Sequence, residues 1–220
     1  MLRVLDLCAG TQSIRRSLEL LYGADNLHYV SVDNMPKFNP TYCTDIRTWD
    51  FRSALDGQHF DVVWCSPPCT EFSCAKTVGH RDLDTADAIV RRCLEIIEFV
   101  KPARWFMENP ATGLLHRRRF MAEYDHLKNT CCYCRYGRDF KNPTHIWSNR
   151  ADLHLLTCCK ATPCEHKRLT NIHPSSAQKG THALVRGLVQ WGIKKELAYE
   201  IPQALIQALF LDTPLASALA

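Results

Sequence analysis

A stiff, thiol-rich turn follows a short apolar segment in the first third of the chain. FDVVWC (60–65) is typical of a buried strand, and SPPC (66–69) follows it directly. Two successive prolines fix φ and keep each preceding residue extended, so the backbone that holds Cys69 is stiff. A thiolate held there, favoured by neighbouring N–H groups or a cation, can act as a nucleophile. Cys69 is therefore the candidate nucleophile, with a small core residue as the alternative, whereas Cys65 is expected to be buried and inert.

An acid closes a second apolar segment. RWFMEN (104–109) predicts a strand that carries Glu108 near its end, and Pro110 follows. A carboxyl at such a point is partly removed from water, which raises its pKa and keeps it protonated near neutrality. It can then act as a general acid or donate to a ring nitrogen. With no evident Cys–His pair, this thiol and acid fit attack on an electron-poor heterocycle better than hydrolysis.

A loop with one glycine and a strand-end acid indicate a nucleoside-type cofactor. DLCAGTQS (6–13) follows a strand and opens a helix, where backbone N–H groups can meet a ligand. Its single glycine, Gly10, separates it from the three-glycine dinucleotide fingerprint. Asp33 ends the strand YVSVD (29–33), and a carboxylate there can accept both hydroxyls of a ribose. The alternative for Asp33 is a turn former.

Alternating strands and helices position these residues. Strands are expected at 3–8, 29–33, 60–65 and 104–109. Helical spacing of apolar residues predicts one helix capped by Ser13 and a long one capped by Asp84 that ends at Lys101-Pro102. This alternation predicts an α/β fold with a parallel sheet and helices on both faces. Active sites of such sheets lie beyond the carboxyl ends of the strands, where all the candidate residues fall.

The pattern changes after about residue 128. NTCCYCRYG and THIWSN predict a pair of short strands, and residues 150–183 have little apolar periodicity. A helix returns where Leu197, Ile201, Leu205 and Leu209 recur, with a boundary expected just before Pro202. We therefore expect three parts: a catalytic core (1–149), a Cys/His-rich insertion or reduced target-recognition region (150–190), and a C-terminal helix that returns to the core (191–220).

Composition excludes several classes of protein. The chain has 220 residues, a net charge of +4 and 12 cysteines, and 46% of its residues are hydrophobic. No apolar stretch reaches the roughly 18 residues that span a bilayer, and the N-terminus is strand-like at once. A core of this size does not need disulfides. We expect an intracellular monomer with reduced thiols and no membrane contact, and the mildly basic charge permits a polyanionic partner.

The ordered motifs resemble the cytosine-5 DNA methyltransferases, most closely their compact phage and viral forms. The motifs are DLCAGTQS, VSVDN, TDIRTWDF, SPPCTEFS, ENP and a late IPQALIQAL, over about residues 2–149 and 196–210. The resemblance implies a Rossmann-like S-adenosylmethionine-dependent methyltransferase fold with a small Cys/His-rich insertion, and DNA as the partner. It also implies a cofactor site made of Asp6, Cys8, Ala9, Gly10, Thr11, Gln12, Asp33, Asn34, Asp45, Ile46 and Pro67.

The same resemblance implies the chemistry. Cys69 would attack carbon 6 of a flipped-out cytosine, Glu108 would engage ring N3, and a methyl group would pass from S-adenosylmethionine to carbon 5. The family's Gln-x-Arg-x-Arg motif, whose arginines help hold the base and thiolate, has no clear counterpart. Arg135 and Arg138, in CRYGR, are the candidates for its role.

A metal site is a further expectation. TCCKATPCEHK (157–167) offers Cys159, or Cys158 in its place, with Cys164 and His166 as zinc ligands. A fourth ligand would come from His173 or from the Cys131–Cys134 group. The alternative is a reduced, metal-free loop. A zinc ion there would stabilise a small module that touches DNA through Lys160, Lys167 and Arg168.

Two rival functions fit parts of the pattern. An exocyclic-amino (N4) methyltransferase also has a Pro-Pro turn after a strand, but an aromatic residue usually follows the prolines, where this chain has Cys69. A non-catalytic relative that binds nucleic acid or supports a partner fits the missing arginine motif. The presence of Cys69, Glu108 and Asp33 together argues against it. The net charge is compatible with RNA as well as DNA.

Overall fold

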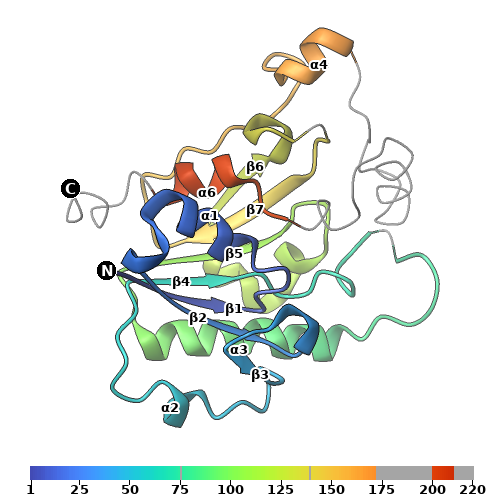
Figure 1. Ribbon diagram of the computed structural model, residues 1–220. Coiled ribbons are helices and arrows are strands. Elements are labelled where there is room, and N and C mark those ends of the chain that lie inside the picture. The colour runs from blue at the N-terminus through green and yellow to red at the C-terminus, as the bar shows by residue number, and fades with distance from the viewer. Residues whose placement is uncertain (75, 139, 172–199, 211–220) are drawn as a thin grey trace.

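A seven-stranded sheet forms the centre of the structure (Figure 1). The computed structural model describes residues 1–74, 76–138, 140–171 and 200–210. The strands are β1 (Leu2–Leu7), β2 (Leu27–Asp33), β3 (Tyr42–Cys43), β4 (Val62–Cys65), β5 (Arg104–Pro110), β6 (Lys128–Cys132) and β7 (Pro143–Ser148). Their order across the sheet is β3-β2-β1-β4-β5-β7-β6.

The first five strands run parallel, and β7 reverses the direction. β2 pairs with β3 and β1, and β4 pairs with β1 and β5, all in parallel. β7 is antiparallel to both β5 and β6, so the short strand pair expected after residue 128 is confirmed. The carboxyl ends of β1, β2, β4 and β5 therefore meet at one edge of the sheet, where the candidate residues follow.

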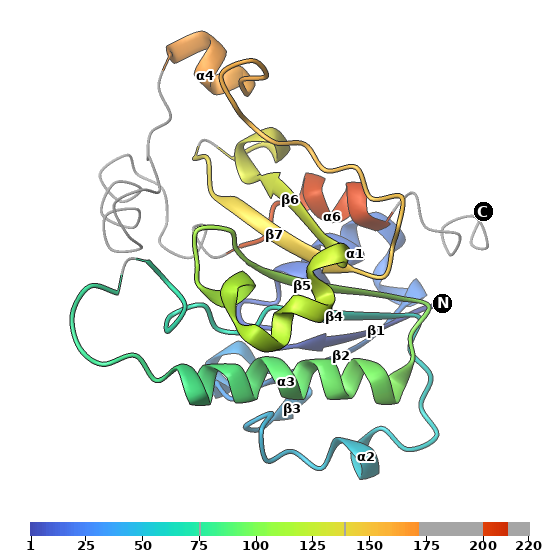
Figure 2. The same ribbon diagram turned by 180° about the vertical axis from the view of Figure 1, so that it is seen from behind.

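Helices cover both faces of the sheet. α1 (Ser13–Tyr22) and α6 (Gln203–Phe210) pack side by side on one face, and α3 (Leu83–Val100) lies on the other (Figure 1 and Figure 2). The shorter helices are α2 (Phe51–Ala54), α4 (Glu165–Thr170) and the 3-10 helices η1 (Ala24–Asn26), η2 (Pro36–Phe38), η3 (Leu115–Arg117), η4 (Arg119–Leu127) and η5 (Tyr133–Tyr136). This arrangement confirms the predicted α/β class.

Two helix starts differ from the expectation. Asp82, not Asp84, caps α3, because its carboxylate accepts from Thr85 N at 3.0 Å. Asp84 lies inside the first turn, where an acid faces the positive end of the helix dipole. Ser13 does not cap α1 either: it is already helical, and Gln12 takes the cap position in the left-handed conformation without a side-chain cap bond.

Each face of the sheet has its own apolar core. Strand side chains alternate between faces, so β1, β4 and β5 contribute to both cores. The core under α3 includes Leu5, Val63, Val90, Ile96 and Met107. The core under α1 and α6 includes Ile14, Trp64, Phe106, Leu205 and Phe210. α6 begins at Gln203, just after Pro202, where the boundary was expected just before the proline, and it closes this second core.

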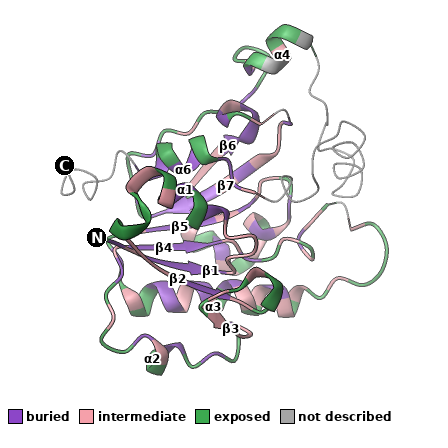
Figure 3. Ribbon diagram, viewed as in Figure 1, coloured by how far each residue is buried: buried purple, intermediate pink, exposed green. Residues whose placement is uncertain are grey.

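In the segment from 151 to 171, Leu153 belongs to the second core and Leu155 packs against it. Most residues of this segment are exposed, and α4 projects away from the sheet (Figure 3). Residues 172–199, which include Leu197 and the second part of the expected insertion, are outside the described part, so the predicted domain boundaries stay predictions. Among the described residues, no helix has the length and apolarity that crossing a membrane requires.

Candidate active site

The turn that carries Cys69 is fastened before the thiol. Ser66 N donates to Leu7 O at 3.0 Å, which extends the pairing of β4 with β1. Asn109 is fully buried, and its Nδ2 donates to the carbonyl of Pro67 at 3.0 Å. This bond joins the end of β4 to the end of β5, so it holds the turn that carries Cys69 in place next to β5.

The chain is fastened again after the thiol. Phe72 is fully buried in the core under α3, and its carbonyl accepts from Leu114 N at 2.8 Å. The Glu71 carboxylate accepts from Lys76 Nζ at 2.5 Å and from Asp82 N at 2.8 Å. Cys69 lies partly exposed between these anchors.

Cys69 and Glu108 share one site. Removal from water raises the pKa of the Cys69 thiol to about 11, and the negative charge of Glu108 adds to the rise. Glu108 is partly exposed as a residue, yet removal of its carboxyl from water raises its pKa to about 7. Near neutral pH the site therefore holds a thiol beside a carboxyl that can carry its proton. Cys65, by contrast, is fully buried in β4, as expected.

Tyr133 completes the acid site. Its hydroxyl donates to Glu108 Oε1 at 3.0 Å, which lowers the pKa of Glu108 and partly offsets the effect of burial. Tyr133 lies at the start of η5, directly after β6, and is buried. Nothing in the sequence around Tyr133 predicts that its side chain contacts Glu108. Only the pairing of β6 with β7, and of β7 with β5, brings it to Glu108.

A pocket lies among the ends of β1 and β2, the loop after β3, and α3. It is lined by Cys8, Asp33, Asn34, Asp45 and Ile46, together with Val32, Thr44, Pro68 and Ile89. The first five are residues expected at the cofactor. Ile89 and Pro68 were not among the residues expected there; they reach the pocket from α3 and from the turn that carries Cys69. The pocket thus combines apolar walls with two acids and adjoins the thiol turn.

Asp33 holds the loop after β1. Its Oδ2 accepts from Gly10 N at 2.9 Å and its Oδ1 from Met35 N at 2.8 Å. A carboxylate has about four acceptor sites, so Asp33 can still accept from two hydroxyl groups. Gly10 has φ +48°, which glycine adopts without strain. Cys8 and Gln12 share this left-handed region, with φ of 59° and 54°, so the loop is tightly wound.

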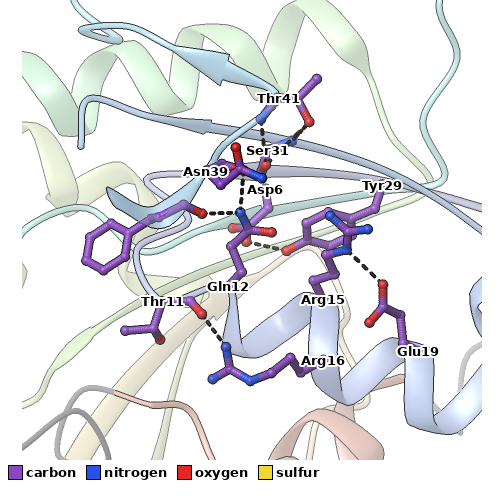
Figure 4. A network of polar contacts seen from close by, with 11 residues as sticks. Asp6, Thr11, Gln12, Arg15, Arg16, Glu19, Tyr29, Ser31, Asn39 and Thr41 are labelled. Carbon is purple, nitrogen blue, oxygen red and sulfur yellow. Dashed lines mark hydrogen bonds and ion pairs between the residues drawn. The ribbon is translucent and has the colours of Figure 1, made fainter. Parts of the chain in front are cut away.

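Side chains around the start of α1 brace the same loop (Figure 4). Gln12 Nε2 donates to the carbonyls of Phe38 and Asn39 at 2.6 and 2.9 Å. Arg16 Nη1 donates to Thr11 O. Gln12 therefore ties the loop after β1 to η2.

Five residues expected at the cofactor do not line the pocket. They are Ala9, Gly10, Thr11, Gln12 and Pro67. Ala9 N donates to Val32 O at 3.1 Å, and Pro67 offers its carbonyl to β5. The chain reverses so tightly after β1 that these residues support the pocket through backbone and bracing contacts.

Asp6 lies beneath α1 and does not line the pocket either. It is fully buried, and the Tyr29 hydroxyl donates to its Oδ2 (Figure 4). Burial raises the pKa of Asp6 to about 7, an effect that the Tyr29 bond partly offsets and the nearby Asp33 charge increases. Asp6 therefore supports the strand and helix around the loop.

Two arginines fasten the loop after β3. Arg47 binds the Asp45 carboxylate through Nη2 at 2.6 Å and Nε at 3.1 Å, which lowers the pKa of Asp45. Arg92, on α3, donates from Nε to Ile46 O at 3.2 Å and from Nη2 to Trp49 O at 2.9 Å. Ile46 is thereby held in the pocket wall.

The structure does not bring Arg135 or Arg138 to the thiol. Arg135 Nη1 donates to Pro163 O at 2.9 Å. Arg138 donates to Glu200 O at 3.3 Å and lies 3.6 Å from the Glu200 carboxylate. Both arginines serve contacts on the side of η5 that faces α4 and α6, whereas Tyr133 faces Glu108.

Three buried thiols meet near α4. The sulfur atoms of Cys134, Cys158 and Cys164 all lie within 4.8 Å of one another. Of the expected ligands, Cys164 belongs to this cluster. Cys158, the alternative to Cys159, belongs to it as well, and Cys159 does not. Cys159 is exposed, and its Sγ lies 3.1 Å from Thr162 Oγ1.

Cys134 comes from the Cys131–Cys134 group, one of the two sources expected for a fourth ligand. The backbone of His166 lies in α4, but its side chain is outside the described part, as is the whole of His173.

Similar proteins point to one family. The family model for C-5 cytosine-specific DNA methylase matches residues 2–133. A probable DNA (cytosine-5)-methyltransferase of Frog virus 3 (isolate Goorha) is 29% identical over 224 residues, which cover 94% of this chain and 98% of that protein.

Two solved methyltransferase structures share the fold. EhMeth of Entamoeba histolytica gives a TM-score of 0.53 at 14% identity, covering 71% of this chain and 57% of that chain. A mutant of Spodoptera frugiperda DNMT2 gives 0.50 at 15%, covering 73% and 56%. The match thus spans a little over half the length of both solved chains. Because the family model matches well over half of the present sequence, the chain belongs to the C-5 cytosine-specific DNA methylase family.

Proposed function

We propose that the protein transfers a methyl group from S-adenosylmethionine to carbon 5 of cytosine in DNA, through a covalent bond to Cys69. The observation that carries the proposal is the pairing of Cys69 with Glu108 across the Asn109–Pro67 hydrogen bond. A stiffly held thiol beside a carboxyl with a pKa of about 7 suits a base that must be protonated as it is attacked.

The pocket fits S-adenosylmethionine in its chemistry. Asp33 has acceptor capacity left for the two ribose hydroxyls. Ile46, Ile89 and Pro68 offer apolar contact to an adenine ring. When bound, S-adenosylmethionine supplies an activated methyl group. Pro68 joins this pocket directly to Cys69, so the methyl donor and the thiol would lie on either side of one short turn.

The cytosine chemistry follows from the two side chains. Cys69, as the thiolate, forms a bond to carbon 6, and the electron pair of the 5,6 double bond moves toward carbon 5 and the ring. Protonated Glu108 donates to N3 and so stabilises the electron-rich ring. After carbon 5 gains the methyl group, a base removes its proton, and the electron pair returns to the ring as the Cys69 thiolate leaves. The target base must be flipped out of the duplex for these contacts.

The test uses two cysteines of one loop. Wild-type protein, Cys69→Ser and Cys74→Ser are incubated with plasmid DNA and methyl-labelled S-adenosylmethionine, and the labelled nucleoside is identified by mass spectrometry. Cys74 is the matched control, because it is exposed, five residues from Cys69, and its thiol donates to Thr112 O, which serine can also do. We expect labelled 5-methylcytosine with wild type and C74S, and none with C69S.

The other outcomes discriminate between the rivals. Label on the exocyclic N4 would replace the proposal with an amino methyltransferase. Label in RNA but not in DNA, with RNA supplied in a parallel reaction, would change the substrate. No label from a folded protein that binds S-adenosylmethionine would indicate a non-catalytic relative.

A further inference from the structure

The thiol cluster near α4 has no place in the proposed methyl transfer. Cys134 comes from η5, and Cys158 and Cys164 come from the coil that leads into α4. All three are buried, and a fourth cysteine, Cys132 at the end of β6, packs in the same cluster. No disulfide joins the cysteines of the described residues.

The coil around these thiols has no apolar core of its own. Between residues 154 and 164, all of which are described, only Cys158 and Cys164 are buried. The same stretch forms no helix or strand. Three hydrogen bonds tie it to the sheet side: Cys132 N to Leu156 O at 3.0 Å, Leu156 N to Tyr136 Oη at 2.9 Å, and Arg135 Nη1 to Pro163 O at 2.9 Å. A segment with two buried thiols and no other buried side chain is typical of a metal-held loop.

The sulfur positions suit a tetrahedral ion. A zinc–sulfur bond of about 2.3 Å places two ligand sulfurs about 3.8 Å apart in a tetrahedron. The three sulfurs, within 4.8 Å of one another, need to approach by at most about 1 Å. Cys164 N also points at Cys158 Sγ at 3.3 Å, the kind of N–H···S bond that orients a ligand sulfur.

We propose that Cys134, Cys158 and Cys164 bind a structural zinc ion that joins the coil before α4 to η5. Structural zinc sites almost always have four ligands. Cys132 is the described side chain that packs against the other three, and His166, two residues after Cys164, is the alternative that the sequence offers. A zinc ion accounts for the close approach of these thiols, none of which forms a disulfide.

The site would act on the catalytic centre through Tyr133. That residue stands directly before Cys134 and donates to Glu108. By holding η5 in place, the zinc ion would keep the Tyr133 hydroxyl within hydrogen-bond distance of the Glu108 carboxyl. The inference does not depend on methyl transfer, because metal content is measured without any reaction.

The experiment compares neighbouring cysteines in the full chain. Wild type, C158S, C164S and C159S are purified without added chelator, and zinc per chain is measured by mass spectrometry of the metal. Cys159 is the matched control, since it is adjacent to Cys158 but exposed and bonded to Thr162. We expect one zinc per chain in wild type and C159S, and its loss in C158S and C164S.

Two further measurements keep the proposal testable if a variant fails to fold. Cobalt loaded into zinc-free wild type should give the strong sulfur-to-metal bands of a tetrahedral thiolate site, and chelation of wild type should lower its thermal midpoint. Folded wild-type protein that holds no zinc and takes up none on reconstitution would overturn the inference. So would C158S and C164S that keep one zinc each, or a cobalt spectrum of an octahedral oxygen site.

Discussion

Burial and the charge of Glu108 both raise the pKa of Cys69. When both groups are ionised they repel, so loss of the Glu108 proton makes the Cys69 thiolate harder to form. A protonated Glu108 removes that repulsion and at the same time offers a hydrogen bond to a ring nitrogen. The side chain that would hold the base therefore also controls how readily the nucleophile forms.

Replacing the acid separates these two effects. In Glu108→Gln, the Cys69 thiol should have a pKa below the wild-type value of about 11, because a neutral amide does not repel the thiolate. Methyl transfer should nevertheless fall by about 10²–10⁴-fold, since the general acid is lost. Alkylation of Cys69 as a function of pH, followed by peptide mass spectrometry, gives the thiol pKa, with exposed Cys74 as the internal control. An unchanged Cys69 pKa would contradict the pairing.

Asp6 makes a prediction about stability. Its folded pKa of about 7 lies above the ordinary 3.8, so between pH 4 and 7 the folded state holds a proton that the unfolded state has released. The free energy of unfolding therefore falls as pH rises through this window, by up to roughly 4 kcal/mol from this one group. Asp6→Asn stays neutral and can still accept from Tyr29.

The measurement is the difference between wild type and Asp6→Asn. Urea unfolding at pH 5 and pH 8 should show that the variant gains stability relative to wild type at the higher pH. Glu108 contributes a similar slope to both proteins and so cancels. Equal slopes in the two proteins would mean that Asp6 is not held neutral in the fold.

At the scale of elements, the residues at the strand ends could be predicted, but the residues that packing and strand pairing bring to the site could not. Apolar runs followed by Asp33, SPPC and Glu108 place those residues at one edge of a parallel sheet, since that is where such strands end. Ile89 and Tyr133 reach the same region through the packing of α3 and the pairing of β6 with β7. Neither contact has a signature within a short sequence window.

The thiol cluster illustrates the same limit. Residue types alone left Cys158 and Cys159 as alternatives. Only the folded path of the coil decides which of these two adjacent side chains is buried, and it buries Cys158. The cap of α3 shows the same limit. Asp82 N donates to the Glu71 carboxylate, and the Asp82 carboxylate accepts from Thr85 N, so Asp82 caps the helix where Asp84 was expected.

Arg92 of α3 holds the loop after β3 in place. Arg92 donates to two carbonyls of the loop after β3, at Ile46 and Trp49. Arg92→Ala leaves both without these donors, so we expect S-adenosylmethionine to bind about tenfold more weakly or worse. Isothermal calorimetry gives the Kd. Arg91→Ala is the control on the same helix, because Arg91 lies over the Phe120 ring and should leave the Kd unchanged.

At the scale of the whole molecule, α6, near the end of the chain, covers the face of the sheet on which α1 lies. α6 packs against α1, and residues just before it reach the first turns of that helix. Ile201 N donates to Ser13 Oγ at 3.4 Å, and Glu200 pairs with Arg16 at 2.5 Å. The C-terminal segment therefore braces the helix that follows the loop after β1, and the stability of that face depends on residues nearly 190 positions apart.

This long-range closure predicts an uneven response to mutation along α6. Leu205 is fully buried against the second core, so Leu205→Ala should lower the free energy of unfolding by about 2–5 kcal/mol through lost burial and a cavity. Gln207→Ala, on the exposed side of the same helix, should change it by less than about 0.5 kcal/mol. Urea unfolding measures both. Equal effects would mean that α6 does not pack on α1 in solution, and the core under α1 and α6 would then be exposed to water.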